Sequence, residues 1–141
     1  GGTSEAMLHM RIREELGLCY YIGSNYSSHK GVCFIHSGID PSKKDTVLQE
    51  TTEIIEKIKN MDYDSSLLDI AKKANITGII ESKDSNSSLA IRSERMSFYN
   101  KTVDFETKIK GIENVTKEQV SEVAKKLVLD TTLLLRGKSN E

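Results

Sequence analysis

The fold of this chain is decided by one stretch, LGLCYYIGSNYSSHKGVCFIHSGI, which spans residues 16–39. It contains two runs rich in aromatic, β-branched and cysteine residues, 19–26 and 32–39, joined by a polar segment that ends in Gly31. Two such runs on either side of a short glycine-containing turn predict an antiparallel hairpin. Both runs are partly apolar on both faces, so we expect each face to be covered by this chain or by a partner.

Helical patterns flank the hairpin on both sides. Upstream, apolar residues recur every four positions and predict a helix over residues 4–16, with a stop at Gly17. Downstream, Ser42 followed by Asp45 predicts the cap of a second helix. The inner face of that second helix is expected to hold Val47, Ile54, Ile55 and Ile58.

Four more elements are predicted in the second half of the chain. A helix capped by Asp64 or Ser65 is followed by a helix that runs to Asn100, and a capping box from Thr116 to Gln119 begins a last helix. Residues 131–136 are expected to form a closing strand. The inward positions of these helices are predicted to be Leu67, Leu68, Ala71, Ala74, Ile79, Leu89, Met96, Tyr99, Val123, Ala124 and Leu127.

This order of elements predicts an α+β fold, an antiparallel sheet with helices packed on one face. No linker or internal repeat divides the 141 residues, so we expect one domain over residues 1–141. A sheet of three strands is thin and leaves an edge unpaired, which favours association with a partner.

Composition excludes several classes of protein. Twenty Lys and Arg balance twenty-one Asp and Glu, so no basic excess exists to bind nucleic acid by neutralising phosphates. No apolar run reaches the roughly 18–20 residues of a membrane span. Two cysteines, Cys19 and Cys33, are too few for a disulfide framework, and we expect them to be buried, close together on paired strands and reduced in a cytoplasm.

Motifs for metal, nucleophilic and phosphate chemistry are missing from the sequence. The histidines His9, His29 and His36 belong to no zinc-binding motif, and no nucleophile elbow or phosphate loop occurs. Residues 30–37 resemble an RNA-binding strand only faintly, because Val32 and Ser37 stand where stacking aromatics are needed. We therefore predict no metal ligand and no nucleic-acid interface in this chain.

One constellation remains, on either side of Gly17. Arg13 stands on the last turn of the first predicted helix, and Tyr20 stands near the start of the first predicted strand. A local interpretation makes Arg13 a cation that complements the helix dipole and Tyr20 an aromatic strand residue. The alternative is a binding pair, since a guanidinium suits a carbonyl or carboxylate and a phenol can donate a hydrogen bond to a carbonyl oxygen.

Four motifs follow one another along the chain. They are Gly1-Gly2-Thr3-Ser4 with Arg13-Glu14, Gly17-Leu18 and Tyr20; Lys30-Gly31 leading to Ser37-Gly38-Ile39-Asp40; Leu68 with Ala71-Lys72; and Ile112 with Val115-Thr116 and Gln119-Val120. In this order they resemble the second domain of the pitrilysin/insulinase family of zinc peptidases, and most of all its bacterial, processing-peptidase-like branch. Family members read GGxSxxLxxxxRExxGLxY at the first motif. Leu67 departs from the pattern, because the family often has Glu there.

The resemblance implies a place in a larger assembly. In that family two homologous halves form a clam shell, and the zinc motif HxxEH lies in the first domain of the catalytic half. An Arg/Tyr pair on the opposing half holds the peptide substrate near the scissile bond, and Arg13 and Tyr20 match that pair by type and spacing. The resemblance thus implies a substrate-binding role for these two residues. It implies no catalytic residue and no metal ligand in this chain, with zinc in the full-length enzyme or its partner half.

The resemblance also implies that residues 1–141 are a partial, C-terminal-type domain, because the family's domain begins about one strand–helix unit before Gly1. We therefore expect a fragment of a bacterial, cytoplasmic zinc metallopeptidase that self-associates and is inactive alone. Its partners would be a peptide substrate and the remaining halves of a clam-shell peptidase. Two alternatives stay open: a non-catalytic paralogue that acts as an interaction subunit, and a generic α+β interaction module in which Arg13 and Tyr20 are structural.

Overall fold

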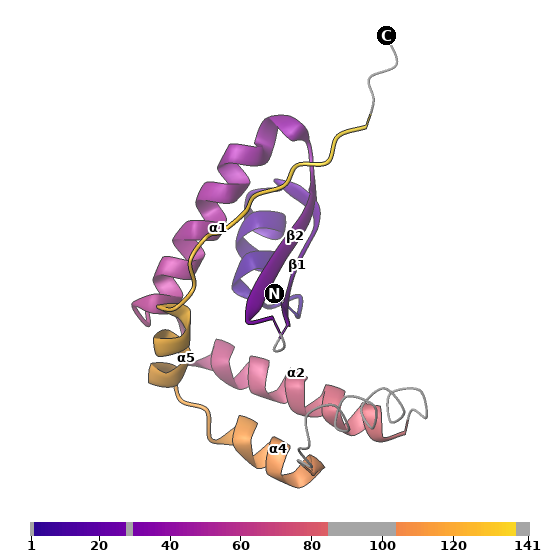
Figure 1. Cartoon of the computed structure of the whole chain (residues 1–141), viewed down its shortest axis with the longest axis vertical. Helices are drawn as coiled ribbons and strands as arrows, with labels where there is room; N and C mark the ends of the chain where they lie inside the picture. The colour runs from indigo at the N-terminus through magenta and orange to yellow at the C-terminus, as the bar shows by residue number, and fades with distance from the viewer. Residues whose placement is uncertain (1, 28–29, 85–103, 138–141) are drawn as a thin grey trace. The chain divides into compact units, whose positions relative to one another are not determined.

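A computed structural model describes residues 2–27, 30–84 and 104–137 (Figure 1). The chain forms two compact units, one of Gly1–Asp64 with Lys117–Glu141 and the other of Ser65–Thr116. The fold is α+β, as predicted, with a two-stranded antiparallel sheet in the first unit and helices in both units.

The predicted hairpin is present almost residue for residue. Strand β1 (Cys19–Ser27) pairs with β2 (Val32–Ile39), and Ile22 lies opposite Ser37. One face of the sheet, with Ile22, lies against the core, while the other face presents Tyr21, Phe34 and His36. Tyr21 and Phe34 are about half exposed, so within the described residues nothing covers that second face.

The first predicted helix is present but wider than an α-helix. Helical structure begins at Met7, and the π-helix η1 (His9–Glu15) follows. Helix α1 (Lys44–Lys59) lies beside it in the same unit (Figure 1). The core forms where these two helices meet β1, and its buried members are Leu8, Ile12, Ile22, Val47 and Ile54.

The cap of α1 differs from the predicted one. The N-cap position of α1 is Lys43, which makes no side-chain capping bond, and the cap lies one short turn earlier, at Asp40. The Asp40 carboxylate accepts hydrogen bonds from the Ser42 backbone N–H at 2.8 Å and hydroxyl at 2.6 Å. These bonds hold the pKa of Asp40 below its ordinary value. Pro41 explains the shift, because its fixed φ suits the first position of the short 3₁₀ turn η2 (Pro41–Lys43) that leads into α1.

Helix α5 (Lys117–Ala124) begins directly after Thr116, as the capping box predicts. It buries Ala124 but not Val123, which is 60% exposed. The other buried residue of α5 is Ser121, whose hydroxyl donates to the backbone carbonyl of Lys59 at the end of α1. That carbonyl belongs to the last turn of a helix and has no partner within it, so the bond secures α5 against α1.

The second unit pairs α2 (Ser65–Lys83) with α4 (Phe105–Glu113). The ammonium of Lys72 donates to the Glu113 carbonyl at 2.9 Å, and that of Lys83 lies 4.9 Å from the ring centre of Phe105. Helix α4 is not among the elements predicted from the sequence, although Asp104 is a clear N-cap whose carboxylate accepts from the Thr107 N–H at 2.6 Å. The helix expected to run to Asn100, with Leu89, Met96 and Tyr99, lies outside the described residues.

The closing strand predicted over residues 131–136 is wrong. These residues form no strand in the structure, and Leu133 and Leu135 are 79% and 85% exposed. Strand-forming residues make a strand only where a neighbouring strand supplies hydrogen bonds. In the part of the chain that the structure describes, β1 and β2 pair with each other and not with this segment.

The core makes a direct prediction about stability. Ile12 is fully buried, so Ile12→Ala should destabilise the first unit by about 2–5 kcal/mol. Met10→Ala is the matched control on the same helix, because Met10 is 42% exposed and should cost less than about 1 kcal/mol. Urea denaturation of the full-length protein, followed by circular dichroism, measures both. Equal effects of the two variants would show that Ile12 does not hold the core.

Candidate functional site

A helix, a tight turn and a strand together position the two candidate residues. Helix η1 ends at Glu15 with Leu16 as its C-cap, and Gly17 follows with φ of +57°, a left-handed conformation that glycine adopts without strain. The Leu18 N–H reaches back to the Ile12 carbonyl at 2.9 Å, and the Lys43 ammonium donates to the Gly17 carbonyl at 3.2 Å. Two hydrogen bonds therefore hold the turn, one to a carbonyl of η1 and one from a lysine of η2.

Tyr20 lies just beyond this turn, at the second position of β1. Its side chain is 85% exposed, and it makes no hydrogen bond with any described residue. Strand β1 has a register irregularity between Cys19 and Tyr21, opposite the end of β2. Bulges of this kind redirect a side chain, and here the side chain between the two irregular positions points to solvent.

Arg13 lies on the last turn of η1 with 44% of its side chain exposed. One guanidinium nitrogen, Nη1, donates to His9 Nε2 at 2.8 Å, and Nε lies 3.7 Å from a carboxylate oxygen of Glu14. The structure joins Arg13 and Tyr20 by no hydrogen bond within the described residues. Arg13 is also a cation near the helix C-terminus, so the local interpretation accounts for its charge but not for the exposure of Tyr20.

Arg11, two positions before Arg13, makes hydrogen bonds that stabilise the fold. Its guanidinium donates to both carboxylate oxygens of Glu50 on α1, at 2.8 and 3.3 Å, and to Glu15 at 3.0 Å. The hydrogen bond to Glu50, and then the one to Glu15, raise the pKa of Arg11. This fork ties η1 to α1 and distinguishes Arg11 from Arg13, whose partners His9 and Glu14 lie on η1 itself.

The described residues do not fit a zinc ion. They contain no group of three or more His, Cys, Asp and Glu side chains placed to hold a metal. His9 is engaged with Arg13 and Glu14, and His36 lies on the exposed face of β2, with its ring centre 6.1 Å from that of Tyr21. No chemical step can be derived from a metal bound to these residues.

The cysteines are not arranged as expected. Cys19 is half-buried and lies opposite Ile39, whereas Cys33 is exposed and lies opposite Tyr26. Tyr26 is seven positions along β1 from Cys19, or about 23 Å at the usual rise per strand residue. The predicted proximity and the predicted burial of Cys33 are therefore wrong, because the core covers only the end of the hairpin that holds Ile22 and Ile39.

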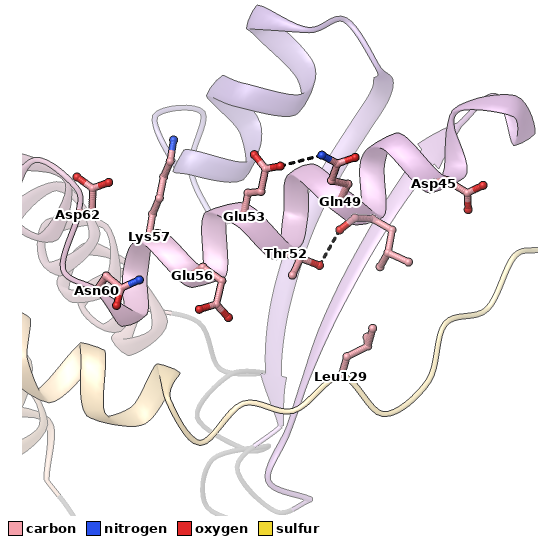
Figure 2. Close-up of a pocket in the computed structure, with 10 residues that line it drawn as sticks. Asp45, Gln49, Thr52, Glu53, Glu56, Lys57, Asn60, Asp62 and Leu129 are labelled. Atoms are coloured by element: carbon pink, nitrogen blue, oxygen red, sulfur yellow. Dashed lines mark hydrogen bonds between the residues drawn. The ribbon is translucent and has the colours of Figure 1, made fainter.

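A shallow groove of about 590 Å³ lies between α1 and the segment that follows α5 (Figure 2). Its polar side chains are partly satisfied within α1: Gln49 donates to Glu53 at 2.9 Å, and the Thr52 hydroxyl donates to the Leu48 carbonyl at 2.8 Å. Arg13 and Tyr20 are not among its walls. The groove is lined by Asp45, Leu48, Gln49, Thr52, Glu53, Glu56, Lys57, Asn60, Asp62 and Leu129.

Comparison with known proteins identifies the family. Residues 1–75 match the family described as the peptidase M16 inactive domain. The chain belongs to this family. The match covers η1, the turn and the hairpin, including Arg13 and Tyr20, and it confirms the resemblance to a C-terminal-type, non-zinc domain of the pitrilysin family.

A curated relative extends the match across nearly the whole chain. The chain is 28% identical over 137 residues, 97% of its length, to a Bacillus subtilis (strain 168) protein named "Probable inactive metalloprotease YmfF". The alignment takes in 32% of that relative, so the chain spans about a third of its length. The bacterial character of the resemblance is thereby confirmed.

A solved structure shares the fold. The crystal structure of a conserved protein from Enterococcus faecalis V583 superposes with a TM-score of 0.82 at 24% identity. The superposition covers 89% of this chain and 30% of that one. Among the described residues, no helix has the length and apolar character needed to cross a membrane.

The register of the hairpin predicts how the thiols react. Both cysteines should titrate as free thiols, and Cys33 should react with Ellman's reagent faster than half-buried Cys19. Kinetics on the native full-length protein measure this, and Cys33→Ser, the matched control, should remove the fast phase. A Cys19–Cys33 disulfide, found by mass spectrometry of the unreduced protein, would contradict the register.

Proposed function

We propose that this chain supplies a peptide-binding surface to a pitrilysin-family protein, through Arg13 and Tyr20, and performs no bond cleavage itself. The observation that carries the proposal is the 85% exposure of Tyr20 at the start of β1, just beyond the fixed turn that follows Arg13 and η1. A tyrosine so exposed at the start of a strand adds little to stability, which favours a role in binding.

The chemistry of the two groups suits an extended peptide. Arg13 keeps its Nη2 amino group without a partner among the described residues, so the two N–H donors of Nη2 can both bond to a peptide carbonyl or carboxylate. The Tyr20 hydroxyl can donate to a carbonyl oxygen, and that bond strengthens as the oxygen gains negative charge. The pair would therefore hold a peptide and, in a catalytic assembly, favour its tetrahedral intermediate.

The rest of the machinery would come from elsewhere in the assembly. Within the proposal, zinc and its activating glutamate belong to another segment of the full-length protein or to a homologous partner half. The chain then acts as a partial C-terminal-type domain in a cytoplasmic protein. Self-association fits the same picture, because the face of the sheet with Tyr21 and Phe34 is exposed and a second copy could cover it.

One observation favours a second candidate, a non-catalytic paralogue that binds peptides or a homologous subunit without cleaving them. The relative that aligns with 97% of this chain is named a probable inactive metalloprotease. Both candidates use the same Arg13/Tyr20 surface, and they differ in whether the full-length protein turns over a peptide. A generic interaction module with a structural Tyr20 has less support, since it needs a buried, bonded hydroxyl.

The test is a conservative change at Tyr20 in the full-length protein. Tyr20→Phe removes one hydroxyl and should lower turnover of labelled β-casein by roughly 100- to 1000-fold, the usual cost of one oxyanion donor. In a protein without turnover, the same variant should weaken casein binding, measured by fluorescence anisotropy. The urea midpoint should stay unchanged, because the hydroxyl has no partner among the described residues.

The matched control is Tyr26→Phe, which removes a hydroxyl from an exposed tyrosine at the other end of β1. It should leave both turnover and binding unchanged. If Tyr20→Phe behaves like Tyr26→Phe, or if it unfolds the protein, the binding role of Tyr20 is wrong.

A further inference from the structure

His9 lies one helical turn before Arg13 and touches it directly. Its side chain is only 15% exposed, whereas those of Arg13 and Glu14 are 44% and 51% exposed. Arg13 Nη1 lies 2.8 Å from His9 Nε2, and Glu14 Oε1 lies 3.7 Å from His9 Nδ1. The imidazole is thus the inner member of a three-residue cluster whose outer members reach solvent.

The contact with Arg13 fixes the state of the imidazole. A guanidinium offers only N–H donors and does not lose its proton in proteins, so Nε2 must accept the hydrogen bond. An accepting Nε2 carries no proton, which makes His9 neutral and places its hydrogen on Nδ1. That atom is buried without a hydrogen-bond partner among the described residues, and the Glu14 carboxylate is 3.7 Å away.

A neutral hydrogen-bond acceptor affects the charge of Arg13 differently from a carboxylate. A carboxylate in the place of His9 would hold the guanidinium but cancel its charge, as Glu50 does for Arg11. The imidazole holds Nη1 and leaves the positive charge uncancelled on that side. The exposed Glu14 is too far from Nε for a hydrogen bond, and water screens it.

We propose that His9 is a positioning residue for Arg13: its neutral imidazole, protonated on Nδ1, holds Nη1 so that Nη2 faces the bound peptide. This inference rests on the proposed binding role of Arg13. The whole cluster lies within η1, a π-helix, and such wide turns are rare and frequently mark functional sites. The ordered contact removes the cost of immobilising a long, exposed side chain when the peptide binds.

Two substitutions at His9 in the full-length protein distinguish the loss of the hydrogen bond to Arg13 from a change in side-chain volume. His9→Leu keeps the volume but cannot accept a hydrogen bond, and it should weaken binding of labelled β-casein roughly tenfold, as expected for a lost hydrogen bond to a charged group. His9→Gln restores a neutral acceptor for the hydrogen bond from Arg13. This variant should therefore bind casein with an affinity within about twofold of wild type. The control His36→Leu changes an exposed histidine on β2 and should leave binding unchanged.

The Arg13→Ala background tests whether His9 acts through Arg13. In that background His9→Leu should add no further loss of affinity, since the group that it positions is gone. A full additional tenfold loss would mean that His9 contributes directly or through the fold, and would overturn the positioning role.

A spectroscopic readout tests the contact without any ligand. Long-range ¹H–¹⁵N spectra of the full-length protein, labelled at histidine, should assign the proton of neutral His9 to Nδ1. Arg13→Ala should shift the population toward the Nε2–H tautomer. A His9 that carries its proton on Nε2 in the wild-type protein would overturn the proposal.

The outcomes separate the two proposals. If Arg13→Ala weakens binding while His9→Leu does not, the positioning role fails and the binding role of Arg13 stands. If Arg13→Ala binds casein like wild type, the binding role fails and the positioning role falls with it, even where the spectra show the Nδ1–H tautomer.

Discussion

The complete burial of Ile12 is the constraint on which the rest of the candidate site depends. Ile12 fixes the rotation of η1 about its axis, because it packs with Ile22 of β1 and with Val47 and Ile54 of α1. The directions of the neighbouring side chains are then fixed as well. Arg11 donates to Glu50 on α1, and Arg13 points away from the core. One apolar side chain therefore decides which of two nearby arginines bonds to α1 and which keeps its partners on η1.

The turn at Gly17 carries this orientation over to the strand. Its left-handed backbone and the bond from Leu18 to Ile12 place the start of β1 close behind the end of η1. The ammonium of Lys43, which follows the hairpin in the sequence, donates to the Gly17 carbonyl and helps to hold the turn. A ligand group bound by Tyr20 and Arg13 would thus meet a rigid frame, and rigidity lowers the entropic cost of binding.

The sequence predicts local structure well where a residue's role depends on its neighbours in the chain. The aromatic and β-branched runs around Gly31 define both strands within one residue. Predictions that depend on distant partners fail: residues 131–136 form no strand because nothing described pairs with them, and Ser121 is buried because the Lys59 carbonyl needs a donor. The sequence reveals Arg13 and Tyr20 only through a family motif, and it gives no sign of the contact between His9 and Arg13, since i,i+4 histidine–arginine spacing is common on exposed helices.

Site-specific photo-cross-linking shows whether the surface around Tyr20 faces a bound peptide. Position 20 of the full-length protein is replaced with p-benzoylphenylalanine, which is irradiated in the presence of labelled β-casein. Position 26 is the reference, because Tyr26 is also aromatic and is 67% exposed at the other end of β1. We expect cross-links to casein from position 20 and few from position 26. Equal yields, or none from position 20 while casein is bound, would show that the surface around Tyr20 does not face the peptide.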